Sequence, residues 1–218
     1  MAKILFSPIG GSDPIRNFRD GSMLHICRYY LPDKVILYLT GEMYQHHLQD
    51  NRYVYCLEEL SKKISHPFDI EIITRDELKE VQDYEYFYDD FRTCIGQINS
   101  QMNSEDELFL NVSSGTPAMK NALIILATLA EFSFKPIQVS TPLKRSNYMD
   151  ENVRKYEVEE QWLLDEDNEE NADVTSRCEE VKSLNLIKLL KTNILEKHLM
   201  AYDYPAAYEA VSYTHLRA

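Results

Sequence analysis

Two short stretches of small and hydroxyl-bearing residues could bind an anion through their main chain. One is Gly10-Gly11-Ser12-Asp13 and the other is Ser113-Ser114-Gly115-Thr116, and a proline follows each. Glycine permits a tight turn and a close approach to a ligand. Thr116 is a good N-cap for the helix that follows, and the N–H groups and dipole of a helix start attract phosphates. The same residues also suit an ordinary strand-to-helix turn, and the turn alone does not separate the two interpretations.

Five short apolar runs alternate with helical segments and predict where these stretches lie. The predicted strands cover residues 3–9, 34–40, 69–74, 108–112 and 135–141. The first predicted helix begins at Asp20, after an irregular loop over 13–19. The other predicted helices cover 42–64, with a break near Asp50-Asn51, then 84–102 and 118–130. The alternation is typical of an α/β fold with a doubly wound, Rossmann-like parallel sheet. Right-handed crossovers predict the strand order 3-2-1-4-5. The first and fourth strands are then neighbours, and both stretches meet in one crevice, which favours a ligand site.

The pattern changes beyond Pro142. Residues 156–164 alternate weakly and predict an extra antiparallel strand, and residues 165–173 look like an acidic link. Apolar residues at helical spacing return from Val181, and residues 201–210 predict the start of a second helix. We therefore expect a ligand-sensing domain over 1–175 and the beginning of a truncated all-α domain over 176–210. The last eight residues, 211–218, do not continue the pattern, and we expect an artificial or frameshifted tail there.

Charge and composition exclude several classes of partner. The net charge is −13, and most of it lies between Asp150 and Asp173. Binding to genomic DNA depends on clustered Lys and Arg, so DNA is not an expected partner, whereas a small phosphate ligand held by main-chain N–H groups is not excluded. No apolar segment is long enough to span a bilayer, and residues 1–10 resemble a strand rather than a signal peptide. We expect a cytoplasmic protein with no membrane partner.

Several motifs of cofactor and metal enzymes are absent from the sequence. There is no G-x-G-x-x-G after the first strand and no P-loop, and the histidines lack the spacing of metal ligands, so we expect no cofactor and no metal. The serines and Thr116 lack a G-x-S-x-G elbow, which favours contacts to phosphate or ribose over nucleophilic catalysis. Arg19 and His25 match the arginine–histidine spacing of one class of metal-free ribonucleases, but a hydrogen-bonded, partly buried His25 is the favoured interpretation.

The two stretches together resemble a known family. SSGTPAM at residues 113–119 resembles the hallmark turn of CARF (CRISPR-associated Rossmann fold) domains, and residues 4–40 resemble the amino terminus of the type III-A CRISPR ancillary CARF–HEPN ribonucleases of streptococci and their relatives. The resemblance extends over about residues 3–200. It implies a homodimer whose paired crevices bind one cyclic oligoadenylate, with six adenosines favoured over four. Binding would activate metal-free RNA cleavage by a HEPN domain. That domain is missing here, so we expect a sensor without its effector, and contact with single-stranded RNA only through the missing domain.

The resemblance also implies site residues. The ligand-binding positions of the family fall on the two stretches, and further candidates lie near them, so that the full set is Gly10, Gly11, Ser12, Asp13, Arg16, Thr40, Asn111, Ser113, Ser114, Gly115, Thr116 and Met119. Some CARF domains also cleave their activator by attack of a ribose 2′-OH on the adjacent phosphate, which needs alignment and oxyanion donors but no metal. Thr116 and Ser114 are the catalytic candidates for such a step.

Two other function classes stay open. A CARF-type transcription regulator would need a basic helix-turn-helix, and neither the acidic residues 150–173 nor the helices after 181 provide one. A metabolic Rossmann enzyme with a small nucleotide substrate is the other alternative.

Overall fold

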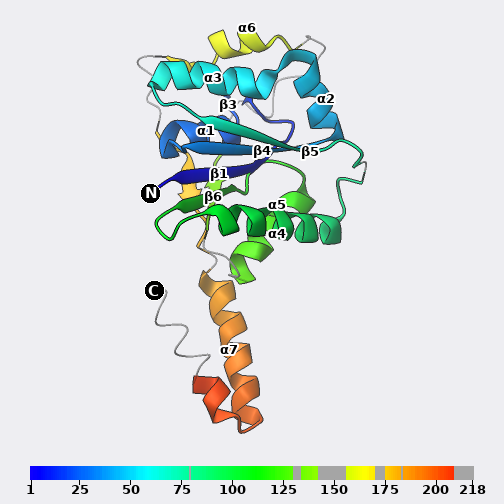
Figure 1. Ribbon diagram of the computed structural model, residues 1–218, viewed down its shortest axis with the longest axis vertical. Coiled ribbons are helices and arrows are strands. Elements are labelled where there is room, and N and C mark those ends of the chain that lie inside the picture. Colours follow the sequence, from blue (N-terminus) through cyan, green and yellow to red (C-terminus); the bar gives the residue numbers. More distant parts are fainter. Residues whose placement is uncertain (79, 130–133, 142–155, 170–174, 183, 209–218) are drawn as a thin grey trace. The chain divides into compact units, whose positions relative to one another are not determined.

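The computed structural model describes residues 1–78, 80–129, 134–141, 156–169, 175–182 and 184–208 (Figure 1). The chain divides into two compact units, Met1–Val181 and Lys182–Ala218. The second unit contains helix α7 (Leu184–Met200), which confirms the helical segment predicted after Val181, and residues 204–208 are also helical. The predicted boundary after residue 175 stays a prediction, although the sheet of the first unit continues past it. The predicted tail, 211–218, lies outside the described residues.

A six-stranded sheet forms the centre of the first unit. Its order is β5-β4-β1-β6-β7-β8, and all neighbours are parallel except β7 and β8. The strands are β1 (Lys3–Pro8), β4 (Lys34–Thr40), β5 (Asp69–Arg75), β6 (Glu107–Asn111), β7 (Lys135–Val139) and β8 (Cys178–Glu180). The five predicted strands and their order are thereby confirmed. β1 lies between β4 and β6, so the loops that leave β1 and β6 start side by side.

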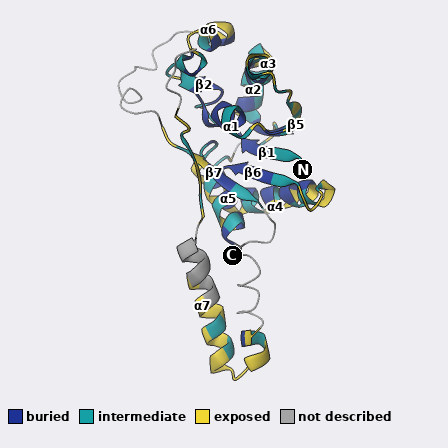
Figure 2. Cartoon of the chain, turned by 90° about the vertical axis from the view of Figure 1, so that its left-hand side faces the viewer, coloured by how far each residue is buried: buried dark blue, intermediate teal, exposed yellow. Residues whose placement is uncertain are grey.

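Helices cover both faces of the sheet (Figure 1). One face carries α1 (Ser22–Tyr30), α2 (Gly41–Asp50), α3 (Arg52–Ile64) and α6 (Val158–Leu163), and the other carries α4 (Tyr84–Gln101) and α5 (Pro117–Leu129). Leu5 packs among the core residues of the face with α1, α2, α3 and α6, and Phe6 among those of the face with α4 and α5. Neighbouring residues of β1 therefore point to opposite faces of the sheet. A sheet covered on both faces needs continuous apolar strands, which is why β1, β4 and β6 are buried along most of their length (Figure 2).

The break predicted near Asp50-Asn51 separates α2 from α3. Asn51 has a φ of 54°, a left-handed conformation that ends one helix before the next begins. Asparagine tolerates this conformation better than most residues. Helices α4 and α5 match the predicted segments to within two residues at each end.

The segment between β1 and α1 differs from the prediction. A small antiparallel hairpin, β2 (Ile15–Arg16) and β3 (Arg19–Asp20), replaces the irregular loop, and α1 starts at Ser22 rather than at Asp20. Asn17 and Phe18 connect the two strands with φ values of 53° and 58°. Positive φ at both central residues is the signature of a two-residue turn with the twist that a hairpin needs. The sequence lacks the usual Asn-Gly signal, so the turn could not be seen there.

The prediction for residues 156–173 was wrong in two respects. Residues 158–163 form helix α6 rather than a strand, because Val158 and Trp162 are four residues apart and both pack into the core. The first part of the acidic stretch is not a free link, since Asp165 and Asp167 are buried around the short 3₁₀ helix η1 (Glu166–Asn168). The antiparallel strand that joins the sheet is β8 instead.

No helix within the described ranges combines the length and the hydropathy needed to cross a bilayer.

Candidate functional site

The loops that follow β1 and β6 touch each other, which confirms their predicted convergence. A Cβ atom on Gly10 would lie 2.7 Å from the main-chain nitrogen of Gly115 and 3.2 Å from Ser114 Oγ. The Ser114 hydroxyl donates a hydrogen bond to the carboxylate of Asp13. Glycine is therefore required at position 10 by close main-chain contact, and the two loops form one continuous surface.

Asp13 connects three elements from a buried position. Besides the Ser114 hydroxyl, its carboxylate accepts the N–H of Met23 in the first turn of α1 at 3.1 Å and the N–H of Gly10 at 3.4 Å. Burial raises the pKa of Asp13, although the hydrogen bonds from Ser114, Met23 and Gly10 oppose the shift. The side chain of Asp13 thus holds both loops and the start of α1 together, and its role in the described structure is to stabilise their arrangement.

Asn111 performs a similar task at the end of β6. Its side-chain amide donates to Ser7 Oγ at 2.9 Å and to Ser22 Oγ at 3.0 Å, and its Oδ1 accepts the N–H of Ser113 at 3.0 Å. Ser113 Oγ in turn accepts the N–H of Val139 at 2.7 Å. The second loop is therefore fixed to β1, α1 and β7.

Thr116 caps helix α5, as predicted. Its hydroxyl donates to the carbonyl of Val81 at 2.7 Å and accepts the N–H of Met119 at 3.4 Å. Ser114 is buried and bonded to Asp13. The two hydroxyls predicted to take part in ligand cleavage are thus both engaged in hydrogen bonds within the protein.

A cavity of about 780 Å³ opens next to the two loops at the carboxyl edge of the sheet. Of the predicted ligand-binding residues, Ser12, Arg16 and Ser113 line it. The structure adds ten residues from the hairpin, the start of α1, the end of β7, η1 and the residue before β8: Asn17, Arg19, Asp20, Gly21, Ser22, Val139, Ser140, Thr141, Glu166 and Arg177. The other predicted residues lie outside the lining, buried at Asp13, Thr40, Asn111, Ser114 and Met119, half-buried at Gly10, Gly115 and Thr116, and exposed at Gly11. Their contacts with a ligand stay predictions.

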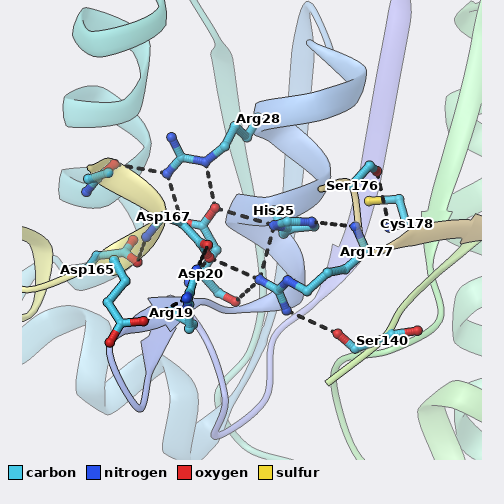
Figure 3. Close-up of polar contacts among 12 residues, drawn as sticks. Arg19, Asp20, His25, Arg28, Ser140, Asp165, Asp167, Ser176, Arg177 and Cys178 are labelled. Atoms are coloured by element: carbon cyan, nitrogen blue, oxygen red, sulfur yellow. Dashed lines mark hydrogen bonds and ion pairs between the residues drawn. The ribbon is translucent and has the colours of Figure 1, made fainter. Parts of the chain in front are cut away.

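A network of buried charges lies behind one wall of this cavity (Figure 3). Arg28 donates from Nε and Nη2 to the two oxygens of Asp20 at 2.7 and 3.0 Å. Asp167 accepts Arg19 Nη1 at 2.7 Å, the N–H of Asp20 at 2.9 Å and Arg177 Nη2 at 3.1 Å. The network therefore connects the hairpin and α1 with η1 and with Arg177, the residue that precedes β8.

His25 is a structural member of the network. It is fully buried, and its Nε2 accepts the main-chain N–H of Arg177 at 3.0 Å. Its Nδ1 lies 3.1 Å from Arg177 Nη2 and 3.6 Å from Asp20 Oδ2. The arginine–histidine spacing from Arg19 to His25 therefore does not form an exposed ribonuclease pair.

Asp20, His25 and Asp167 bring potential metal-ligand atoms within 4.8 Å of one another. Both carboxylates, however, are already paired with arginines: Asp20 with Arg28, and Asp167 with Arg19 and Arg177. A cation would have to displace these guanidinium groups. The donor set therefore fits an ion-pair network better than a metal centre.

The surroundings of Asp165 favour its protonated form. As a carboxylate, it would leave Oδ2 buried without a hydrogen-bond partner among the described residues. Burial, the charge of Asp20 and a hydrogen bond shared with Asp20 together raise the pKa of Asp165 to about 8. A neutral Asp165 can donate to Asp20, whereas an ionised one would repel it.

Replacement of Asp165 by Asn is expected to flatten the dependence of stability on pH. The ordinary pKa of this carboxyl is 3.8, so the stabilisation from its raised pKa is complete below that pH and is lost as the pH rises through about 8. Asp165→Asn keeps a neutral group of the same shape at every pH. Between about pH 6 and pH 9, the difference between the Tm of Asp165→Asn and that of wild type should rise. The rise should be roughly 2–4 °C for each kcal/mol of stabilisation that wild type loses over this range. Melting curves followed by circular dichroism at both pH values test this, and parallel curves for the two proteins would contradict it.

Sequence reasoning missed the wall of the cavity that contains Glu166 and Arg177. Glu166 lies in the stretch 165–173, interpreted as an acidic link, and Arg177 lies in the segment 176–210, interpreted as the beginning of an all-α domain. The available signal was charge complementarity, because arginines at 19 and 28 pair with acids at 166 and 167 and with Asp20. That signal is weak without knowledge of which segments meet.

Comparison with known proteins identifies the family. Residues 69–178 match the family described as Cas_Csm6 CARF domain. The CRISPR system endoribonuclease Csm6 of Enterococcus italicus is 34% identical over 215 residues, covering 96% of this chain and 48% of that protein, and Csm6 of Mycobacterium tuberculosis is 34% identical over 206 residues, covering 94% and 48%. A solved structure of Enterococcus italicus Csm6 bound to cyclic hexa-2′-fluoro-hexa-dAMP is similar with a TM-score of 0.78 and 31% identity, covering 98% of this chain and 50% of that one. The chain spans about half the length of these relatives. It therefore belongs to the Csm6 family and contains the CARF domain of that family.

Proposed function

We propose that the chain is a CARF sensor of a CRISPR type III-A system and that its cavity binds a cyclic oligoadenylate. The observation that carries the proposal is the cavity itself, which is lined by Ser12 of the first loop and Ser113 of the second at the carboxyl edge of the sheet. This edge is where doubly wound α/β proteins bind their ligands. The similar Csm6 structure was solved with a cyclic hexanucleotide analogue, which supports six adenosines as the ring size.

The lining suits a ligand with phosphates and riboses. Hydroxyls of Ser12, Ser22, Ser113 and Ser140 can donate to or accept from such groups, and arginines supply positive charge. A volume of about 780 Å³ is in the range of small-molecule sites. We infer that two chains, related by a two-fold axis, share one ring as a homodimer.

Calorimetry on the purified chain tests the proposal. Cyclic hexa-adenylate, cyclic tetra-adenylate, NAD, ATP and S-adenosylmethionine are titrated separately. We expect saturable binding of cyclic hexa-adenylate with half a molecule per chain, and weaker binding of the tetramer. Saturable binding of NAD, ATP or S-adenosylmethionine without binding of either ring would instead favour a metabolic enzyme. Retention on duplex DNA would favour a transcription regulator.

Cleavage of the bound ring through Thr116 and Ser114 belongs to the same proposal. Thr116→Ala should stop metal-free cleavage of cyclic hexa-adenylate if the hydroxyl acts on the ligand. Because Thr116 also caps α5, Thr116→Ser is the matched control that keeps the hydroxyl. Equal cleavage by wild type and Thr116→Ala would remove Thr116 from this role.

RNA cleavage is proposed only for a protein that combines this sensor with a HEPN domain. In such a protein, cyclic oligoadenylate binding at the CARF domain would activate the HEPN domain. The names of the relatives, CRISPR system endoribonuclease Csm6, support this assignment.

A further inference from the structure

Two arginines from distant parts of the chain meet in the wall of the cavity. Arg19 lies in hairpin strand β3 and Arg177 directly precedes β8, and both line the cavity. Their side chains are 34% and 17% exposed. Each guanidinium group is therefore held in the protein on one side and accessible on the other.

A single buried carboxylate holds both groups. Asp167 Oδ1 accepts Arg19 Nη1 at 2.7 Å, and Asp167 Oδ2 accepts Arg177 Nη2 at 3.1 Å (Figure 3). The side chain of Asp167 is 2% exposed and also accepts the N–H of Asp20, so it cannot easily rotate. Asp167 is thus a side chain that both arginines share, while Arg177 Nη2 also donates to the main-chain carbonyl of Asp20 at 3.0 Å.

Both arginines retain donors beyond those that hold them. Arg19 also pairs with Glu166 through Nη2 at 2.7 Å, and Arg177 donates from Nη1 to the carbonyl of Ser140 at 3.1 Å. A guanidinium group has five N–H donors. Within the described parts of the chain, the Nε–H groups of the two arginines make no hydrogen bond, and Nη1 of Arg177 has a second hydrogen. Such remaining donors fit phosphate oxygens, which arginine recognises in pairs.

The acids that pair with arginines in the wall and in the network behind it are Asp20, Glu166 and Asp167. Arg28 pairs with Asp20, Arg19 with both Glu166 and Asp167, and Arg177 with Asp167. Glu166, itself in the cavity wall, competes with any ligand for Arg19.

We propose that Arg19 and Arg177 bind a phosphate group of the ligand and that Asp167 is the positioning residue that holds both guanidinium groups at the cavity wall. The identity of the ligand as a cyclic oligoadenylate rests on the proposed function, but the phosphate-binding pair does not.

Two substitutions that remove the same charge are expected to act in opposite directions. Asp167→Asn should weaken binding of cyclic hexa-adenylate to the full chain about tenfold or more, because the arginines lose their common support. Glu166→Gln should strengthen binding roughly two- to fivefold, because Arg19 loses a competing surface carboxylate. Glu71→Gln, the matched control, removes the same charge from a surface pair with Lys34 outside the cavity lining and should bind as wild type does. If Asp167→Asn strengthens binding as Glu166→Gln does, Asp167 is only a competing charge and its positioning role is overturned.

The arginines are tested by affinity and by its salt dependence. Arg19→Gln and Arg177→Gln should each weaken binding about 10- to 100-fold, and each should reduce the slope of log affinity against log salt by roughly 0.7 between about 50 and 200 mM NaCl. A merely structural role would not change the slope. Arg177→Gln keeps the main-chain N–H that His25 accepts. If the Gln variant does not fold, Arg177→Lys is tested in its place. Wild-type affinity and slope in both arginine variants would overturn the pair while the proposed function stands.

Pyrophosphate separates failure of the pair from failure of the proposed function. If wild type binds neither cyclic adenylate, its thermal shift with pyrophosphate is compared with that of Arg19→Gln. A shift in wild type that Arg19→Gln abolishes supports the pair as a phosphate site and rejects the cyclic ligand. No shift in wild type overturns both.

Discussion

Asp20→Ala is expected to lower the free energy of unfolding by about 3–5 kcal/mol, the largest stability effect of any substitution considered for this protein. The variant leaves Arg28, with a side chain only 11% exposed, without the carboxylate that accepts its Nε and Nη2. Removal of one partner from a buried pair is costly because the remaining charge stays buried and unpaired. Burial alone would raise the pKa of Asp20, but hydrogen bonds from His25 and Arg28 outweigh it and lower the pKa to about 2. The stabilisation is therefore present above the ordinary pKa of 3.8 and is lost only as the pH falls through about 2.

Urea unfolding at neutral pH, followed by circular dichroism, measures this effect. Glu71→Ala is the matched control, since it breaks a surface pair between Lys34 and Glu71 in which the Glu71 side chain is 48% exposed. The control should change stability by less than about 1 kcal/mol. A loss in Asp20→Ala as small as that of the control would show that the buried network contributes little to stability.

Gly10→Ala is the second large effect, with an expected loss of about 1–3 kcal/mol from overpacking. Its new methyl group would lie 2.7 Å from the main-chain nitrogen of Gly115, and main chain cannot move aside as a flexible side chain can. Gly11→Ala adds the same group one residue later, where nothing lies within 4 Å of it. Its stability should equal or exceed that of wild type by up to about 1 kcal/mol, because alanine reduces the entropy of the unfolded chain.

Thermal melting of the two glycine variants side by side decides the second prediction. Equal Tm values would mean that the loops after β1 and β6 can separate without loss of stability. The close contact between them would then contribute nothing to the stability of the protein. A selective drop in Gly10→Ala would support the view that the loops form one surface.

The sheet and its order were predictable because local patterns determine them. Apolar runs such as those in β1 and β6 must be buried on both faces, and right-handed crossovers leave few orders for five parallel strands. The convergence of the loops at Gly10 and Gly115 follows from that order alone. The start of α5 was predictable for a similar reason, since Thr116 and Pro117 specify a helix start through their own chemistry.

The wall of the cavity was not predictable, because it depends on pairing between distant charges. Asp167 contacts Arg19 across 148 positions of the chain, and no local pattern records such a partner. The acidic composition of residues 165–173 is typical of a solvated link. Only the ion pairs of Glu166 and Asp167 with distant arginines show that this part of the stretch belongs to the folded domain. Helix α6 was mistaken for a strand because a single buried pair, Val158 and Trp162, is too short a pattern to establish a period.

The hydrogen bonds of Asn111 and Asp13 have a consequence for the entropy of ligand binding. Main-chain segments at Ser12 and Ser113 are anchored before any ligand arrives, through Asp13 to α1 and through Asn111 to β1 and α1. A preorganised site loses little conformational freedom on association. On this side of the cavity, the ordering cost should therefore be confined to the ligand, and tight binding can come from main-chain groups without a large excess of positive charge.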